Sequence, residues 1–394
     1  MTRQHPIIHG RPGRPFGDDT QRVRPCGRIG GVPADADATV STRLAAALGS
    51  GAQVLTPTGP AVVADFDACR IAGRTLATDA DWRAVLTTRR MGAVEGAFAA
   101  AWTDSDGTLH LARDAVGERT LYCAEAPAGP VFASSIRAIL ATGLVPRRVN
   151  LRAVATYLSY AYLPGRETLV EGVHELLPGE CVSFGASGLR REVFWELPAL
   201  PRDSAGEEEL TPRLRQNLED AVRARLPATE EPVGAFLSGG LDSSLVVALA
   251  RRLHPAPVHT YSVFFGDGYA NELPFSSLVA DHCGTDHRVV ELSPAAVLHH
   301  LDDAVGLLSD PIGDPLTVPN ALLFREAAER VGIVLNGEGG DPCFGGPKNL
   351  PMLLAELYPR AGNREASYLR AHLKCYDDLP AMLADPVRDA VAAA

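Results

Sequence analysis

The sequence of 394 residues lacks features that several classes of protein require. No run of Lys and Arg interleaves with aromatic residues, and the formal net charge is −11 at pH 7, so we expect no nucleic-acid partner. No apolar stretch approaches the roughly 18 residues of a transmembrane helix. The first 25 residues are rich in Arg, Pro and Gly and lack the apolar centre of a signal peptide. These absences favour a cytoplasmic protein with no membrane partner.

Paired cysteines are also missing. The seven cysteines are scattered along the chain, and none forms a CxxC pair. This spacing argues against a zinc site and against a disulfide framework, and it fits a reducing compartment.

The composition is that of a globular protein, with 46% hydrophobic and 22% charged residues. A chain of this length has enough material for two domains of roughly 150 to 200 residues each. We expect residues 1–25 to form a disordered leader, residues 26–200 to form the first domain and residues 208–394 to form the second.

Residues 26–200 show the pattern of a β-rich domain. Short apolar runs at residues 98–102, 109–113 and 131–133 are separated by Gly, Asp and Pro, and Asp106-Gly107 predicts a tight turn. A polar, proline-containing stretch at 198–211 follows. After it the apolar residues repeat every four positions up to Leu226, which indicates a helix and places the domain boundary before it.

Beyond the boundary, strand-like and helical patterns alternate. We predict strands at residues 233–237, 258–265, 287–292 and 331–335, with helices at 241–253 and 273–283. Alternation of this kind predicts an α/β domain with a parallel sheet and helices on both faces, whose ligands bind beyond the carboxyl ends of the strands.

A glycine-rich segment, SGGLDSS at 238–244, follows the first of these strands and opens a helix. The glycines let the backbone approach a ligand, and the helix start offers unpaired N–H groups and a positive dipole end, which suit a phosphate. The serines add hydroxyl donors, and Asp242 beside a phosphate suggests Mg²⁺. An ordinary strand-to-helix turn with Asp and Ser as helix caps is the alternative interpretation.

The segment resembles the pyrophosphate-binding loop of the N-type ATP pyrophosphatases, and its surroundings resemble the asparagine synthetase branch of that family. Residues 335–341, LNGEGGD, followed by FGG at 344–346, are similar to the family's SGEGxDExFGG. The resemblance implies ATP and Mg²⁺ as cofactors, Asp242 and Asp341 as metal ligands, and Glu338 as the base for the nitrogen nucleophile. The nucleotide-binding residues that it implies are Ser238, Gly239, Gly240, Leu241, Asp242, Ser243, Ser244, Val263, Asn336, Gly337 and Asp341.

A third segment, Asp310-Pro-Ile-Gly-Asp314-Pro315, is similar to the family's substrate-side D-x-P-x-x-D-P. The resemblance therefore implies that Asp310 and Asp314 contact the substrate. Taken alone, both aspartates could be turn formers before proline, and Glu338 could be a solvated carboxylate in a flexible loop. The sequence departs from the family at Pro342, where an acidic residue is usual, so the acceptor side of the pocket is expected to differ.

In the front half, VEGAF at 94–98, LARDAVGERTLY at 111–122 and FASSI at 132–136 resemble the second part of the family's glutaminase domain, so that the likeness covers most of residues 90–394. Such glutaminases use an N-terminal cysteine as nucleophile, with its own amino group as base. Here Cys26 is internal and follows Pro25, and the family's NGEIYN and RGPD segments have no counterpart. We expect a domain that has lost glutamine hydrolysis; removal of 25 residues to expose Cys26 is the alternative.

Only 53 residues follow Asp341, whereas the family places a lysine for the departing pyrophosphate about a hundred residues after this loop. We therefore expect the second domain to be truncated and the chain to be weak or inactive alone. Lys348 is the candidate replacement, although it could equally be a solvated lysine.

The resemblance implies a glutaminase-like (Ntn-type) α+β sandwich joined to an adenine-nucleotide α-hydrolase-like domain. It also implies an ATP-dependent ligase that joins a small-molecule or peptide carboxylate to ammonia or an amine through an acyl-adenylate. A non-catalytic nucleotide-binding paralogue, or a subunit of a larger complex, is the second hypothesis. A homodimer and a partner subunit both remain open.

Overall fold

The computed structural model describes residues 7–9, 28–34, 36–49, 52–55, 61–198, 204–346 and 373–392. The chain divides into two units. One, the sandwich unit, comprises Pro25–Pro201, Ser309–Gly313 and Lys374–Ala394. The other, the parallel-sheet unit, comprises Met1–Arg24, Arg202–Leu308 and Asp314–Leu373.

Two sheets form the sandwich unit. The five-stranded sheet has the order β10-β8-β9-β2-β3, and the six-stranded antiparallel sheet has the order β12-β11-β7-β6-β4-β5. The strands of the first are β2 (Ile29–Gly31), β3 (Gln53–Leu55), β8 (Tyr122–Ala126), β9 (Gly129–Ala133) and β10 (Val173–Glu175). Those of the second are β4 (Val62–Ile71), β5 (Arg74–Thr75), β6 (Val94–Thr103), β7 (Leu109–Arg113), β11 (Glu180–Gly185) and β12 (Gly188–Val193). The described helices of this unit are α1 (Ala38–Leu48), α2 (Asp79–Thr87), η2 (Met91–Ala93), α3 (Ile136–Thr142), α4 (Leu151–Tyr160), η4 (Tyr376–Asp378), α14 (Leu379–Met382) and α15 (Asp385–Ala392).

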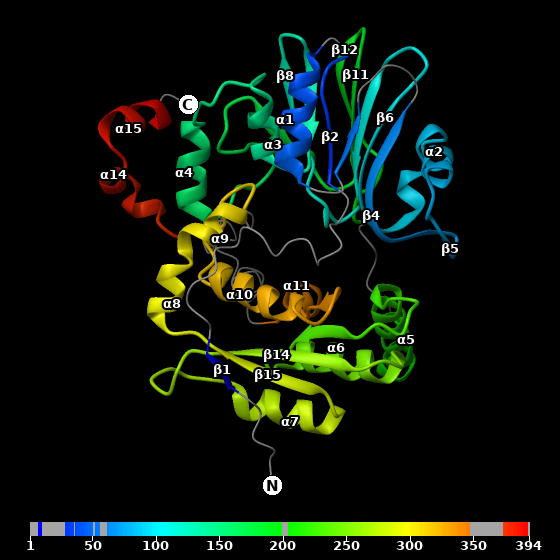
Figure 1. The fold of residues 1–394 in the computed structure, drawn as a ribbon, viewed down its shortest axis with the longest axis vertical. Coiled ribbons are helices and arrows are strands. Elements are labelled where there is room, and N and C mark those ends of the chain that lie inside the picture. The colour runs from blue at the N-terminus through cyan, green and yellow to red at the C-terminus, as the bar shows by residue number, and fades with distance from the viewer. Residues whose placement is uncertain are drawn as a thin grey trace. The chain divides into compact units, whose positions relative to one another are not determined.

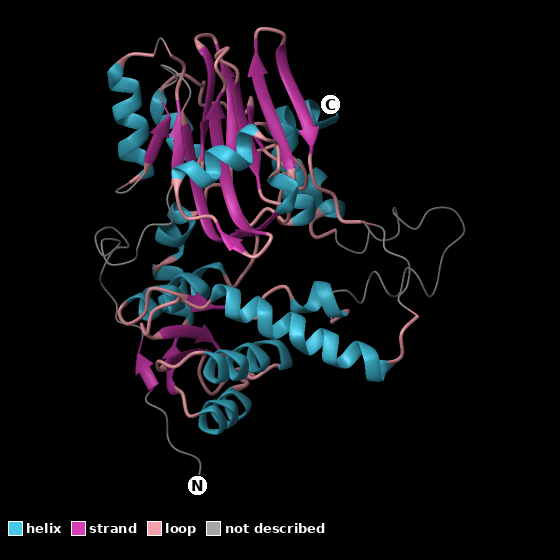
Figure 2. Ribbon diagram, turned by 90° about the vertical axis from the view of Figure 1, so that its right-hand side faces the viewer, coloured by secondary structure: helices cyan, strands magenta, loops and turns pink. Residues whose placement is uncertain are grey.

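The strands of the sandwich unit form two stacked sheets (Figure 2), and the side chains of β6 explain why the sheets pack together. Successive side chains of a strand point to opposite faces. Phe98 and Trp102 accordingly enter a core with α2, whereas Ala99 and Ala101 enter the core between the two sheets. The strands predicted at 98–102, 109–113 and 131–133 are thus confirmed within β6, β7 and β9.

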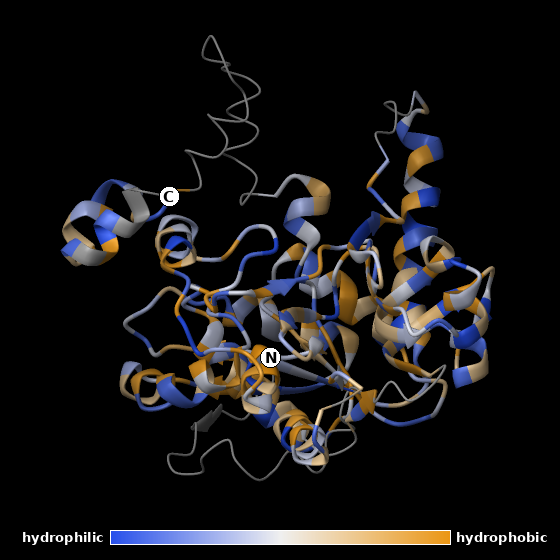
Figure 3. Ribbon diagram, turned by 90° about the horizontal axis from the view of Figure 1, so that it is seen from above, coloured by the Kyte–Doolittle hydropathy of each residue, from blue (hydrophilic) through white to orange (hydrophobic). Residues whose placement is uncertain are grey.

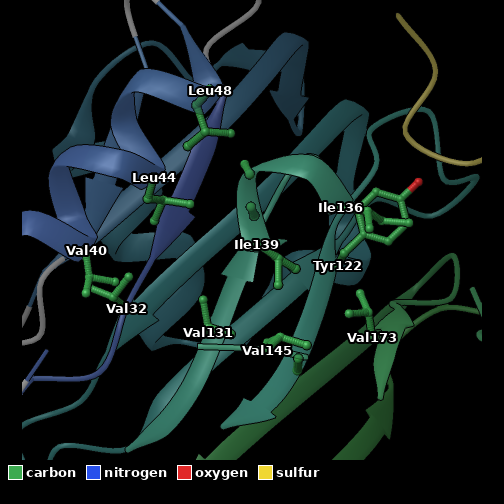
Figure 4. Close-up of a cluster of buried hydrophobic side chains, with 13 residues drawn as sticks. Val32, Val40, Leu44, Leu48, Tyr122, Val131, Ile136, Ile139, Val145 and Val173 are labelled. Carbon is green, nitrogen blue, oxygen red and sulfur yellow. The ribbon is translucent and has the colours of Figure 1, made fainter. Parts of the chain in front are cut away.

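Helices α1 and α3 cover the outer face of the five-stranded sheet (Figure 4). Leu44 and Leu48 of α1 and Ile139 of α3 are completely or almost completely buried there against Val131 of β9. Layers of helix, sheet, sheet and helix therefore build the sandwich unit, which confirms the α+β sandwich that the family resemblance implied.

The parallel-sheet unit has the strand order β1-β15-β14-β13-β16, and every pair of neighbours runs parallel. Its strands are β1 (Ile7–His9), β13 (Val233–Phe236), β14 (Val258–Phe264), β15 (Asp286–Glu291) and β16 (Val334–Leu335). Its described helices are α5 (Glu207–Arg225), α6 (Leu241–Leu253), α7 (Leu273–Cys283), α8 (Pro294–His299), α9 (Leu301–Leu307), α10 (Thr317–Ala328) and α11 (Gly340–Phe344).

Both faces of this sheet are covered, and Figure 1 shows the sheet between α7 and α10. Val247 of α6 and Ala280 of α7 pack on one face with Val233 and Val258, while α9 and α10 pack on the other with Tyr261. The helices carry both hydrophobic and hydrophilic residues, as amphipathic elements at such an interface must (Figure 3). The predicted parallel sheet with helices on both faces is confirmed.

Three local features differ from the sequence predictions. Ile7–His9, expected in an unstructured leader, pair with β15 at the edge of the sheet. The last predicted strand, 331–335, is reduced to Val334–Leu335. Ser309–Gly313 and Lys374–Ala394, expected in the second domain, group with the sandwich unit. Main-chain hydrogen bonds from Gly313 N–H to Ala161 O (2.6 Å) and from Lys374 N–H to Ser159 O (2.7 Å) hold them there.

Candidate active site

The glycine-rich segment forms a tight connection between β13 and α6. Gly239 has φ = +92°, and a Cβ atom at this position would lie 2.6 Å from the amide nitrogen of Ser276 in α7. Only glycine fits this backbone conformation at this distance. The connection ends at Gly240, after which α6 begins with its N–H groups unpaired and its dipole positive. Sequence and structure thus agree on a place that suits a phosphate group.

Two serine hydroxyls hold the loop together. Ser243 Oγ accepts a hydrogen bond from Ser238 N–H (3.3 Å) and donates one to Gly240 O (3.2 Å). Ser238 Oγ accepts from Gly240 N–H (3.2 Å) and lies 3.0 Å from Ser243 Oγ. The serines were predicted to add hydroxyl donors for a ligand, and in this structure the Ser243 proton is used inside the loop.

A second loop leaves the neighbouring strand at the same edge of the sheet. Strands β13 and β16 pair in parallel, with Ala235 opposite Leu335, so the segments after them begin side by side. In the second loop the Asn336 side chain accepts from Glu338 N–H (3.0 Å), and Gly339 is left-handed with φ = +99°. A Cβ atom at Gly337 would lie 2.8 Å from Ser243 N, so the two loops are in contact.

These loops line one pocket of about 210 Å³. Its lining residues are Phe236, Ser238, Gly240, Asp242, Ser243, Asn336, Gly337, Glu338, Gly339 and Asp341. Among the described residues of this lining are three carboxylates and no Lys or Arg. An anionic ligand would therefore need a cation, together with the positive end of α6, to be held here.

Sequence reasoning found most of this lining but missed two residues. Phe236 was assigned to the strand interior, and the αL conformation of Gly339 depends on the turn that Asn336 closes. The sequence signal for both was their closeness to predicted site residues, because Phe236 lies two positions before Ser238 and Gly339 directly follows Glu338.

Several predicted residues lie outside the lining. Leu241 is 84% exposed at the first position of α6, and Val263 is half-buried near the end of β14. Ser244 Oγ is buried, and none of the described residues offers it a hydrogen bond. Gly239 acts through its contact with α7, and Lys348 lies outside the described residues.

The two predicted substrate aspartates fall in different units. Asp310 groups with the sandwich unit, where its Oδ1 accepts a hydrogen bond from Leu169 N–H (3.5 Å). Burial raises the pKa of Asp310 to about 6, and the nearby Glu175 carboxylate adds to the rise. Asp314 groups with the parallel-sheet unit and accepts from Leu316 N–H (2.8 Å) before α10.

In the sandwich unit the segment after β7 is organised by one buried carboxylate. Asp114 is fully buried and accepts hydrogen bonds from the N–H groups of Phe98, Val116, Glu118 and Arg119 at 3.0 to 3.3 Å. The guanidinium of Arg113, the preceding residue in the sequence, pairs with Glu175 (2.8 Å). Asp114 and Arg113 therefore have a structural role in this segment. Cys26 lies outside the described residues.

Comparison with known proteins agrees with this geometry. Residues 213–392 match the family model described as asparagine synthase, and residues 75–195 match that of a glutamine amidotransferase domain. The chain belongs to the asparagine synthetase family.

Individual relatives give the extent of the similarity. The chain is 29% identical over 282 residues to asparagine synthetase (glutamine-hydrolyzing) 1 of Bacillus subtilis (strain 168), which covers 70% of this chain and 44% of that protein. It is 32% identical over 288 residues to a putative asparagine synthetase (glutamine-hydrolyzing) of Mycobacterium bovis, with the same coverage of 70% and 44%. The chain thus spans less than half the length of these relatives.

Among solved structures, the chain is similar to a glutamine-dependent NAD⁺ synthetase from Acinetobacter baumannii in complex with ADP, with a TM-score of 0.27 and 17% identity. The similarity covers 60% of this chain and 54% of that one.

Within the ranges that the structure describes, no helix is both long and apolar enough to cross a membrane.

Proposed function

We propose that the parallel-sheet unit binds ATP in the pocket between its two loops and activates a carboxylate for attack by ammonia or an amine. The products would be an amide, AMP and pyrophosphate. The observation that carries this proposal is the contact between the phosphate loop (residues 238–244) and the GEGGD loop (residues 337–341). This contact gathers three carboxylates at the amino end of α6. Because the chain spans 44% of the length of its curated relatives, the activity is proposed for this pocket and its own residues.

The donor set fits Mg²⁺ held together with a polyphosphate. Within the described residues, no group of three or more His, Cys, Asp or Glu side chains is placed to hold a metal ion. Mg²⁺ needs only one or two carboxylates when phosphate oxygens and waters complete its octahedron. Asp242 and Asp341, both half-buried and both in the lining, would supply these carboxylates, and the metal would neutralise the phosphate charge.

The N–H groups of the first turn of α6 would bind the phosphate oxygens. Asn336, Gly337 and Val263 lie on the strands or loops beside this position and are the proposed nucleotide contacts. Phe236 closes the pocket at the end of β13.

Two steps follow from this arrangement. A substrate carboxylate oxygen attacks the α-phosphorus of ATP, the bond to the β-phosphoryl oxygen breaks, and pyrophosphate leaves. The nitrogen nucleophile then attacks the acyl carbon of the acyl-adenylate, Glu338 takes the proton from nitrogen, and AMP leaves with the bonding electrons. Glu338 is exposed on the pocket lining, where a nucleophile can reach it.

The proposed carboxylate substrate is a small molecule or a peptide. Asp310 and Asp314 stay proposed contacts on the substrate side, and Lys348 stays the proposed cation for pyrophosphate. Pro342 stands beside Asp341 where the family usually has an acid, so the acceptor side should differ from that for aspartate.

The same departure at Pro342 favours a second candidate, a nucleotide-binding subunit without catalysis. ATP–pyrophosphate exchange across a panel of amino-acid and peptide carboxylates separates the two functions. We expect exchange with at least one acid, and about a 10²-fold loss in Asp242→Asn with an unchanged circular dichroism spectrum. Asp267→Asn, an exposed change outside the pocket lining, is the matched control. Undiminished exchange in Asp242→Asn would overturn the assignment; ATP binding without any exchange would favour the second candidate.

A further inference from the structure

A row of buried polar side chains lies on the neighbouring strands β14 and β15 and extends to the residue that precedes the phosphate loop. Thr260 and Ser262 lie on β14, and His287 lies on β15 directly opposite Thr260. Their exposed fractions are 0%, 5% and 2%, respectively. Thr260 and Ser262 alternate with Tyr261, so they face α6 and α7 together with Val258. Polar groups in such an apolar layer are costly unless they are hydrogen-bonded.

Hydrogen bonds connect the row into a chain. Thr260 Oγ1 lies 2.8 Å from Thr285 Oγ1 and 2.9 Å from His287 Nδ1. His287 Nε2 lies 3.4 Å from Ser262 Oγ, and Ser262 Oγ donates to the carbonyl oxygen of Leu237.

Donor counting gives this chain one direction when His287 is neutral. Ser262 has one hydroxyl proton, which goes to Leu237 O, so its oxygen must accept from His287 Nε2–H. His287 Nδ1 then accepts from Thr260, whose oxygen accepts in turn from Thr285. Loss of one member would remove one hydrogen bond from each of its neighbours in a buried place.

This chain of hydrogen bonds ends at Leu237, the last residue before the phosphate loop. Leu237 directly precedes Ser238, and its own N–H donates to Tyr261 O (2.9 Å). The Leu237 peptide is therefore held on both sides, by the main chain of β14 and by Ser262. The orientation of this peptide determines where Ser238 and Gly239 begin the turn.

We propose that His287 and Ser262 are positioning residues, which fix the start of the phosphate loop and so set its affinity for MgATP. The inference rests on the proposed function, because it concerns the same pocket. Neither side chain is in the pocket lining, so they act through the Leu237 peptide.

Two pairs of variants test the proposal. Ser262→Ala and His287→Leu remove the hydrogen bonds, whereas Ser262→Thr and His287→Gln retain a hydroxyl and a donor. His254→Leu is the matched control, because His254 is 3% exposed in the same unit and hydrogen-bonded (2.8 Å) to Glu231 O before β13. This bond lies at the amino end of the strand, away from the loop.

The dissociation constant of MgATP, from calorimetric titration of the whole chain, is compared with the free energy of unfolding in urea. We expect Ser262→Ala and His287→Leu to weaken MgATP binding about tenfold, and their conservative partners to restore most of it. In pyrophosphate exchange, the KM for ATP should rise while that for the carboxylate stays constant. His254→Leu should lower stability without changing the dissociation constant.

Equal MgATP affinity in wild type, Ser262→Ala and His287→Leu would overturn this inference and leave the proposed function standing. Weakening by His254→Leu as large as by His287→Leu would reduce the effect to general loss of stability, and would also overturn it. A wild-type chain that binds no MgATP would overturn the proposed function itself.

Discussion

Gly340 lies directly against the carboxylate of Asp242: a Cβ atom at Gly340 would stand 2.3 Å from Cγ of Asp242. The first residue of α11 thus fills the space beside the proposed metal ligand of the other loop. Because the group in contact is the end of a side chain, it can move without disturbing the fold.

This contact predicts the effect of one added methyl group. Gly340→Ala should turn the Asp242 carboxylate aside and reduce pyrophosphate exchange by about 10-fold to 10²-fold. Its free energy of unfolding should change by less than about 1 kcal/mol, because only a half-exposed side chain must move. Gly332→Ala is the control, since no atom lies within 4 Å of a Cβ there. Normal exchange in Gly340→Ala would show that the position of Asp242 is not critical.

Glu338 should separate the two half-reactions. Glu338→Gln retains the size of the side chain but cannot take a proton, so pyrophosphate exchange should remain while amide formation falls about 10²-fold. Quenched-flow measurement of the two steps checks this result. A parallel fall in both would assign Glu338 to adenylation or to the structure of the loop.

The sandwich unit should not hydrolyse glutamine. The nitrogen of Cys26 is part of the peptide bond with Pro25, so no free amino group can act as base. The purified chain should release no glutamate from glutamine, and Cys26→Ala should leave amide synthesis from ammonia unchanged. Hydrolysis that disappears in Cys26→Ala, with a mature chain that mass spectrometry shows to begin at Cys26, would contradict this prediction.

Asp65 should make the stability of the sandwich unit depend on pH. It is 6% exposed, and burial raises its pKa to about 6 from the usual 3.8, although Arg119 lies 3.5 Å away. The folded state therefore binds the proton more tightly, so the contribution of Asp65 is most favourable below pH 3.8 and is lost as pH rises through about 6.

Replacement by a neutral amide removes this titration. Asp65→Asn should raise the free energy of unfolding by about 1–3 kcal/mol above pH 6 and have little effect near pH 4. Urea denaturation between pH 4 and 8 measures the difference. A variant that is less stable than wild type at pH 7 would show that the pair with Arg119 outweighs the cost of burial.

The phosphate loop was predictable because its signal is local. Two glycines between an apolar strand and an amphipathic helix predict the turn, and the serines beside them favour a phosphate ligand. The contacts of Gly337 and Gly340 were not predictable in this way. They depend on the pairing of β13 with β16, which brings together segments separated by about a hundred residues.

Asp310 illustrates the same limit. Its motif was assigned to the substrate side by likeness, whereas its hydrogen bond joins it to Leu169 in the sandwich unit. No local pattern around Asp310 indicates that partner, because the two residues are 141 positions apart. The row from Thr260 to Ser262 was likewise hidden, since threonine and serine are ordinary in strands.

The chain passes from one unit to the other after residues 24, 201, 308, 313 and 373. Consider a chimera that joins the front half of one homologue to the back half of another at residue 201. Its segments 309–313 and 374–394 would come from one homologue and pack with the sandwich unit of the other. Both segments are held by main-chain atoms, through Gly313 N–H to Ala161 O and Lys374 N–H to Ser159 O. Such hydrogen bonds do not depend on side-chain identity. The exchange of halves therefore requires that both homologues have the same backbone conformation at the end of α4, where Ala161 adopts φ = +64°.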